Sequence, residues 1–196
     1  MAKRSDFDRV PRDAYDTPQA AVDVLLSHID RTVPWIEPAA GANALANALA
    51  QSGIRISHRR DIAPRAPGII AGDGAILPPE VDGHGVVTNP PFRRCEFRRL
   101  LHAWLDQERT CWILQPSGFM HTQWFARERF HAHMAEVVSL PRLQWIPGSE
   151  FKETTDHVWV RYEPEAQVAL IFHPQKAPKG KAARVMLKTA PFATMP

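Results

Sequence analysis

Several classes of protein are excluded by what this sequence lacks. No stretch approaches the ~18 uninterrupted apolar residues of a membrane span, and the first residues, MAKRSDFDRVPRD, contain no apolar segment typical of a secretory signal. Only two of the 196 residues are cysteines (Cys95 and Cys111), too few for a disulfide framework or a four-cysteine zinc site. We therefore expect no membrane contact, no metal site and a reducing, cytoplasmic setting.

The composition that remains is that of an ordinary folded domain, with 44% hydrophobic and 23% charged residues. The net charge is +3, but residues 175–196 contain five lysines and arginines and no acid, which leaves −2 for the rest of the chain. We expect a flexible N-terminus over 1–14, one domain over 15–174, and a flexible basic tail over 175–196. Such a tail could attract nucleic acid or merely solubilise the protein.

Apolar patterns predict strands and helices in alternation along the chain. We expect strands over 32–37, 54–57, 85–88, 111–116 and 135–140. We expect helices over 18–29, 39–53, 94–108 and 121–134. A charged turn is expected over 58–64, and a hairpin over 158–162 and 168–172 with a five-residue loop between the two strands. This order predicts an α/β fold, with a mostly parallel sheet and one antiparallel edge.

Two short segments at predicted strand ends carry candidate site residues. EPAAG (residues 37–41) lies between a strand and an alanine-rich helix, where small residues let a ligand approach free backbone N–H groups. NPPF (residues 89–92) follows a buried valine strand, and its prolines force an extended turn. The carboxyl ends of parallel strands share one crevice, so both segments would face it. Taken singly, each segment also fits a simple structural turn.

Together with YDTP (residues 15–18), these two segments resemble motifs of S-adenosylmethionine-dependent amino-methyltransferases. The closest likeness is to N6-adenine DNA methyltransferases of the compact kind found in phages and mobile elements. The resemblance covers residues 15–115, and 116–173 in outline. It implies a Rossmann-like class I methyltransferase fold, a mostly parallel sheet with an antiparallel C-terminal hairpin. It also implies methyl transfer from S-adenosylmethionine to the N6 amine of a flipped adenine in DNA.

The resemblance implies a role for each matching residue. In the catalytic turn Asn89-Pro90-Pro91-Phe92, the Asn89 side-chain oxygen and the Pro90 carbonyl would accept the two N–H bonds of the amine. Phe92 would stack on the flipped base. Asp61 would bind the ribose hydroxyls of the cofactor, and Asp73 would face its adenine amino group. The other implied cofactor-binding residues are Tyr15, Thr17, Pro18, Glu37, Pro38, Ala39 and Gly41.

Two departures from the family pattern keep other functions open. Asn43 stands where the family usually has a second glycine, and Arg59 and Arg60 directly precede Asp61 and could pair with it on the surface. The alternatives are an RNA methyltransferase acting on guanine N2 or adenine N6, a protein-glutamine methyltransferase, and a catalytically silent relative that binds nucleic acid. A structural α/β domain without a small ligand is a further alternative. The expected assembly is a monomer or a homodimer.

Several side chains outside these motifs allow either a functional or a purely structural interpretation. Four arginines follow the catalytic turn and could hold phosphates or form a solvated helix face: Arg93, Arg94, Arg98 and Arg99. His121, His131 and His133 are expected at the surface rather than as metal ligands, because no acid or cysteine completes a zinc set with them. Trp145 is expected in the core. Sequence readout would come from loops 117–135 or 141–157, from the tail or from a partner.

Overall fold

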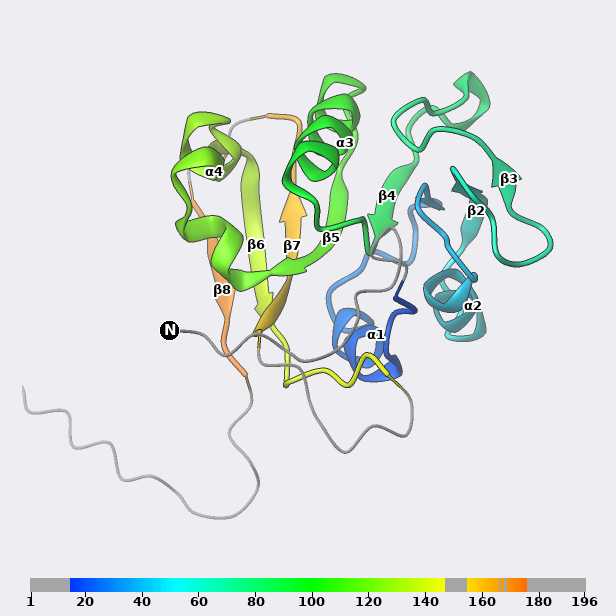
Figure 1. Ribbon diagram of the computed structural model, residues 1–196, viewed down its shortest axis with the longest axis horizontal. Helices are drawn as coiled ribbons and strands as arrows, with labels where there is room; N and C mark the ends of the chain where they lie inside the picture. The colour runs from blue at the N-terminus through cyan, green and yellow to red at the C-terminus, as the bar shows by residue number, and fades with distance from the viewer. Residues whose placement is uncertain (1–14, 147–154, 166, 168, 176–196) are drawn as a thin grey trace, which may run out of the picture.

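The computed structural model describes residues 15–146, 155–165, 167 and 169–175 (Figure 1). Its strands are β1 (Trp35–Glu37), β2 (Ile56–Asp61), β3 (Ile70–Ala71), β4 (Gly85–Thr88), β5 (Cys111–Pro116), β6 (Met134–Ser139), β7 (His157–Tyr162) and β8 (Ile171–His173). Its α-helices are α1 (Gln19–Leu25), α2 (Ala44–Gln51), α3 (Arg94–Asp106) and α4 (Gln123–Arg127). Short 3-10 turns are η2 (Pro79–Val81), η3 (Ser117–His121) and η4 (Phe130–His133).

These strands form one sheet in the order β3-β2-β1-β4-β5-β7-β6-β8. The first five strands of this order are mutually parallel, β7 is antiparallel to both β5 and β6, and β8 is parallel to β6. Strands β4 and β5 are continuous apolar runs because helices cover both faces of the central sheet. The predicted α/β class, with a mostly parallel sheet and an antiparallel C-terminal part, is confirmed.

The antiparallel strand pair is not the one that the sequence predicted. The prediction joined 158–162 to 168–172 as a hairpin, but β7 pairs with β5 on one edge and β6 on the other. Both edges of β7 are thus occupied, so β8 lies at the outside of the sheet, against β6. The short loop between the two apolar runs favoured a local hairpin, whereas the longer connection from β6 to β7 makes the real antiparallel pair.

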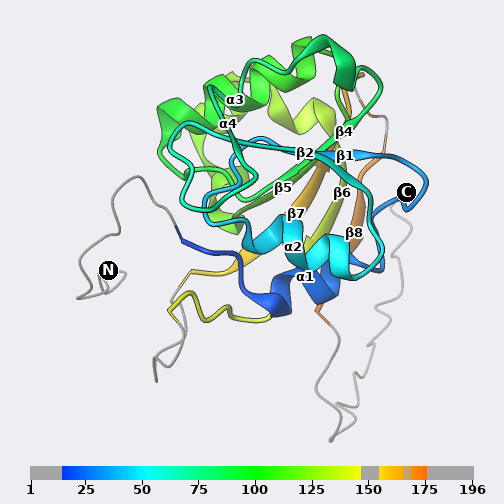
Figure 2. The same ribbon diagram turned by 90° about the vertical axis from the view of Figure 1, so that its right-hand side faces the viewer.

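Helices cover the sheet on both sides (Figure 2), with α3 and α4 on one face and α1 and α2 on the other. Apolar side chains of α3, including Phe97, Leu101 and Trp104, pack with those of β4, β5 and β7. On the opposite face α1 and α2 pack against Trp35, Trp112 and other side chains. The sheet therefore separates two cores, and the strand ends remain as the two places where polar groups can meet.

Several predicted boundaries shift: the helix expected over 18–29 ends at Leu25 and the strand expected over 32–37 begins at Trp35. Three further differences have a clear local reason. The expected charged turn at 58–64 begins as strand, because β2 runs to Asp61 and pairs with β1 on one edge and β3 on the other. The second helix begins at Ala44, since Gly41 (φ 53°) and Asn43 (φ 73°) adopt left-handed conformations before it. The expected helix at 121–134 is divided into α4 and η4, with Arg129 at φ 60° between them.

Within the described residues, the longest helices are too short and too polar to cross a lipid bilayer.

Candidate functional site

A cavity of about 650 Å³ lies where β1, β2 and β4 end. Ten of the residues selected from the sequence line it: Tyr15, Thr17, Glu37, Pro38, Ala39, Gly41, Asp61, Asp73, Asn89 and Pro91. Three others lie outside the lining. Pro18 is the residue preceding α1, Pro90 is buried behind the turn, and Phe92 belongs to a neighbouring group of aromatic rings.

Glu37 places a buried carboxyl group at the end of β1. Its side chain is 2% exposed, and its Oε2 accepts a hydrogen bond of 2.8 Å from the backbone N–H of Ala46 in the first turn of α2. Burial, which disfavours the charged form, raises the pKa of Glu37 to about 8, although the Ala46 bond opposes this shift. Burial therefore favours the neutral form of this carboxyl group in the folded protein.

Asp61 closes the turn between β1 and α2 from the neighbouring strand. Its Oδ2 accepts the backbone N–H of Gly41 at 2.8 Å, and its Oδ1 accepts that of Ala63 at 2.7 Å. No ion pair joins Asp61 to Arg59 or Arg60 among the residues that the structure describes, so the alternative of a surface pairing is not observed there. Asn43 adopts the positive φ of a glycine (73°), and the turn forms without the second glycine.

Asp73 also lines the cavity, in a loop that packs closely against the EPAAG turn. A Cβ atom at Gly74 would lie 2.2 Å from the carbonyl oxygen of Pro38, so this close approach requires glycine. The indole N–H of Trp104 in α3 donates to the Gly74 carbonyl at 2.8 Å and holds the loop in place. Arg99 binds both oxygens of Asp73 at 2.8 and 3.0 Å and lowers the pKa of this carboxyl group.

Arg65 is a lining residue that sequence reasoning missed. Its guanidinium binds Asp16 of the YDTP segment at 2.8 Å, and its backbone N–H donates to the Gly41 carbonyl at 2.9 Å. A Cβ atom at Gly41 would lie 2.9 Å from Arg65 Nη2. Arg65 thus links two segments of the cavity wall, and only its basic charge after the second strand could have drawn attention to it.

Asn89 follows β4, and its side-chain amide donates to the backbone carbonyl of Tyr15 at 3.3 Å. This contact joins the NPPF turn to the YDTP segment, which is far away in the sequence. Two motifs selected separately from the sequence therefore meet at one wall of the cavity.

Aromatic rings surround Phe92 beside this wall. Ring centroids of Phe119, Trp145 and His157 lie 6.3, 6.2 and 5.5 Å from that of Phe92. Trp145 also contacts the ring of Tyr15 at 6.1 Å. The sequence assigned Trp145 to the core, and it does pack on one core, but its half-buried ring also belongs to this aromatic group.

The four arginines after the catalytic turn divide into two pairs. Arg98 and Arg99 form ion pairs with Glu128 and Asp73. Arg93 and Arg94 are exposed, and Arg93 lines the cavity. Arg93 makes a long ion pair of 3.6 Å with Glu96 (i,i+3), and the guanidinium of Arg94 lies 5.7 Å from the ring centroid of Trp124.

Comparison with known proteins finds similar structures but no match by sequence. No protein-family model matches the chain, and no characterised protein matches it at a significant level. A Listeria monocytogenes protein assigned to the class I S-adenosylmethionine-dependent methyltransferases is similar, with a TM-score of 0.57 and 15% identity over 80% of this chain. A structure from a study of the type I restriction–modification system has a TM-score of 0.57 and 16% identity over 89%. The M protein of the type I restriction enzyme EcoKI has a TM-score of 0.50 and 14% identity over 78%.

The chain therefore has the fold of the class I S-adenosylmethionine-dependent methyltransferases. It spans 64%, 47% and 45% of the length of the three similar structures. Identities of 14–16% show the fold alone, and the activity has to be argued from the cavity.

Proposed function

We propose that this chain transfers a methyl group from S-adenosylmethionine to the exocyclic N6 amine of adenine in DNA. The observation that carries the proposal is the single cavity that unites the EPAAG turn, Asp61 and Asn89 at neighbouring strand ends. The class I methyltransferase fold supports the same type of reaction. Two of the similar structures come from type I restriction–modification systems, which supports DNA as the substrate.

The residues of the cavity fit a cofactor of this kind. Its volume of about 650 Å³ lies within the range of small-molecule sites, and Gly41 lets a ligand approach the backbone. Glu37, Gly41, Tyr15 and Thr17 would border the methionine part, together with Pro18, Pro38 and Ala39 nearby. Asp61 would bind the ribose hydroxyls, since each of its oxygens accepts one N–H bond here and has room for a second.

Asp73 would bind the adenine amino group of the cofactor in the same manner. Its carboxylate oxygens are oriented by Arg99 and by the backbone N–H of Ala75. A carboxylate has about four acceptor positions, so these contacts leave capacity for one more donor.

Asn89 and Pro90 would orient the amine that receives the methyl group. When bound, S-adenosylmethionine supplies a methyl group activated by sulfonium, whose transfer breaks an S–C bond, forms an N–C bond and releases one amine proton to water. Asn89 Nδ2 is bonded to Tyr15, so Asn89 Oδ1 is the atom that would accept one amine N–H, and the Pro90 carbonyl the other. These acceptors localise the nitrogen lone pair and align it with the methyl group.

Phe92 and its neighbouring rings would hold the adenine outside the DNA duplex. Enzymes that act on a base need it unstacked, and aromatic side chains offset the lost stacking by about 1–3 kcal/mol per base. The ring of Trp145 belongs to the same group as that of Phe92 and would contribute to this stacking. The exposed guanidiniums of Arg93 and Arg94 are available for phosphates beside the flipped base.

A product assay tests the proposal. The full chain is incubated with methyl-labelled cofactor and either unmethylated DNA or RNA, and digested nucleosides are identified by mass spectrometry. Labelled N6-methyladenine in DNA is the expected result. Label in RNA alone, or on glutamine of an added protein substrate, would replace the proposed substrate. No label anywhere, together with no cofactor binding by calorimetry, would identify a catalytically silent relative.

A further inference from the structure

A second polar site lies at the opposite ends of the parallel strands. His28 follows α1, Glu136 lies in the first half of β6, and His173 ends β8. Glu136 is paired with Arg161 near the end of β7, and Arg161 is paired on its other edge with Trp112 near the beginning of β5. This end of the sheet is therefore distinct from the one that holds the candidate methyltransferase cavity.

One oxygen of Glu136 binds both imidazoles. Its Oε1 lies 2.7 Å from Nδ1 of His28 and 3.0 Å from Nε2 of His173. The two imidazole rings meet at an angle of 66°, with centroids 4.5 Å apart. Potential ligand atoms of all three residues lie within 4.8 Å of one another, although the residues come from three separate elements.

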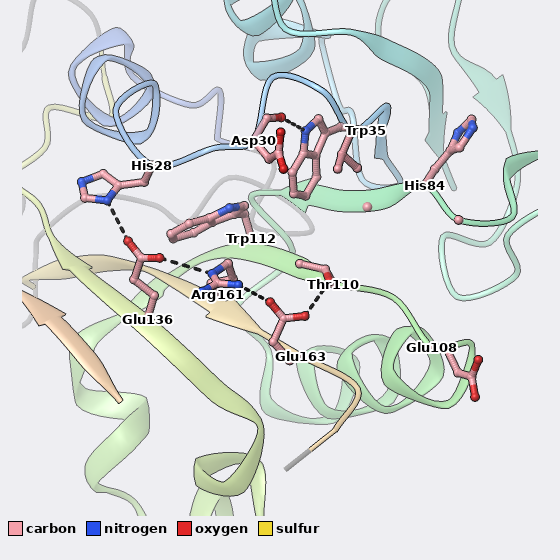
Figure 3. Close-up of a pocket in the computed structure, with 13 residues that line it drawn as sticks. His28, Asp30, Trp35, His84, Glu108, Thr110, Trp112, Glu136, Arg161 and Glu163 are labelled. Carbon is pink, nitrogen blue, oxygen red and sulfur yellow. Dashed lines mark hydrogen bonds and ion pairs between the residues drawn. The ribbon is translucent and has the colours of Figure 1, made fainter. Parts of the chain in front are cut away.

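The second oxygen of Glu136 is held by a different partner (Figure 3). Its Oε2 accepts from Nε of Arg161 at 3.2 Å, and Arg161 is also bonded to Glu163, which accepts the hydroxyl of Thr110 at 2.6 Å. This arrangement fixes the direction of the Glu136 carboxylate while Oε1 stays with the imidazoles. Such orientation by an outer partner is typical of carboxylates that bind metals.

The surroundings favour a cation. A cavity of about 420 Å³ adjoins His28 and Glu136, and its charged lining consists of one guanidinium, Arg161, and four carboxyl groups: Asp30, Glu108, Glu136 and Glu163. The side chains of His28 and Glu136 are only 17% and 12% exposed, which limits competition from bulk water. The adjoining cavity leaves space for a water molecule as a further ligand.

We propose that His28, Glu136 and His173 bind one Zn²⁺ ion, with water as a fourth ligand. Two imidazoles and a carboxylate form a ligand set that zinc accepts in proteins. A tetrahedral ion with bonds of ~2.0–2.2 Å sets its ligand atoms roughly 3.3 Å apart, so each imidazole nitrogen, now 2.7 or 3.0 Å from Oε1, would move away from that oxygen by a few tenths of an ångström. Through His173 and His28, the ion would connect the edge strand β8 to the segment that follows α1.

Zinc binding by the full chain tests this proposal. The protein is treated with a chelator, dialysed and titrated with Zn²⁺ in a calorimeter, and Co²⁺ is added separately as a spectroscopic probe. We expect one equivalent of Zn²⁺, intense visible bands of tetrahedral Co²⁺, and a rise in Tm when Zn²⁺ is added. Absence of saturable binding would overturn the proposal.

Variants distinguish this site from other histidines. His173→Ala and Glu136→Gln should each weaken Zn²⁺ binding by more than ~10-fold and remove the Zn²⁺-dependent rise in Tm. His173 is 40% exposed at the end of an edge strand, so its replacement tests the site even if Glu136→Gln does not fold. His131→Ala, at an exposed imidazole bonded to the Met120 carbonyl, is the matched control and should leave binding unchanged. Unaltered affinity in His173→Ala, or an equal loss in His131→Ala, would assign the ion to other ligands.

Discussion

Acidic side chains at the two ends of the sheet are held by different kinds of partner. At the carboxyl ends, Glu37 and Asp61 accept hydrogen bonds from backbone N–H groups of nearby turns. At the amino ends, Glu136 and Glu163 bind an arginine, histidines and a threonine from distant elements. The backbone partners hold the turns that follow β1 and β2 beside the first cavity, whereas the side-chain partners join elements that lie far apart in the chain.

This contrast leads to a division of effects. Changes at the carboxyl ends should alter methyl transfer and cofactor binding, whereas changes at the amino ends should alter stability and Zn²⁺ binding but not methyl transfer. Five substitutions, taken from the largest expected effect to the smallest, test that division.

Asn89→Ala should lower the methyl-transfer rate by at least ~100-fold, because the amine loses an acceptor that aligns its lone pair. Cofactor affinity should change little, since Asn89 would contact the amine rather than the cofactor. Single-turnover kinetics and calorimetry measure the two quantities separately. Asn47→Ala, the same substitution on the exposed side of α2, is the control. Full activity of Asn89→Ala would refute the proposed role.

Gly74→Ala should destabilise the protein by about 2 kcal/mol and weaken cofactor binding, because the new Cβ meets the Pro38 carbonyl and forces two walls of the cavity apart. Urea unfolding and calorimetry give both effects. Gly118→Ala is matched to it, since a Cβ there would meet no atom within 4 Å. Equal behaviour of the two variants would mean that the close approach is unimportant.

Arg161→Met tests the opposite end of the sheet. Removal of the guanidinium leaves Glu136 and Glu163 without their shared cation and should cost about 1–2 kcal/mol of stability. The methyl-transfer rate, measured well below the unfolding temperature, should remain within about twofold of the wild-type rate. A change as small as this would not indicate the loss of a contact with the substrate or the cofactor. A large loss of rate in a folded variant would contradict the division between the two ends.

Glu37→Gln should change how stability depends on pH. The folded protein binds a proton at Glu37 up to a pKa of about 8, whereas the unfolded chain releases it near 4.5. Between these values the native state holds more protons, so the free energy of unfolding falls as pH rises, by at most about 1.4 kcal/mol per unit from this residue. Glutamine keeps an acceptor for Ala46 but does not titrate, so its urea-unfolding curves should show a shallower fall over this pH range. Parallel pH profiles for the two proteins would indicate an ordinary pKa at Glu37.

Asp16→Asn should have the smallest effect on stability, about 0–0.5 kcal/mol, because both partners of the Asp16–Arg65 pair are exposed. Thermal unfolding measures this difference. Since the pair joins two walls of the cavity, cofactor affinity is the quantity expected to respond more. If Asp16→Asn lost as much stability as Arg161→Met, the exposed Asp16–Arg65 pair would stabilise the protein as much as the more enclosed pairs of Arg161.

Much of the candidate cofactor cavity could be predicted from the sequence because its parts are local. EPAAG begins at the last residue of β1 and NPPF directly after β4, and a parallel sheet brings such segments to one edge. Asp61 was implied by the family resemblance; it ends β2 and accepts the backbone N–H of Gly41, and its role toward the cofactor stays a prediction. Arg65 and Trp145 were missed as lining or neighbouring residues because nothing in their own segments marks them as facing a ligand.

The C-terminal strand order could not be predicted in this way. Short separation in sequence favoured a hairpin, but β7 pairs with β5 and β6, which are longer and more deeply buried than β8. Pairing between strands depends on the total area that the sheet buries, which a local pattern does not report. The cluster of His28, Glu136 and His173 depends on that strand order, since β8 reaches Glu136 only by lying beside β6.

The sequence by itself determined the alternation of strands and helices, the apolar central strands and the polar turns at their carboxyl ends. Those features follow from side-chain period and backbone preference within a few residues. Only the tertiary structure decided which strand borders which, how the aromatic rings gather around Phe92, and which carboxyl groups meet arginine or histidine. These outcomes arise from contacts between residues far apart in the chain, whose energies depend on burial and geometry rather than on neighbouring residues.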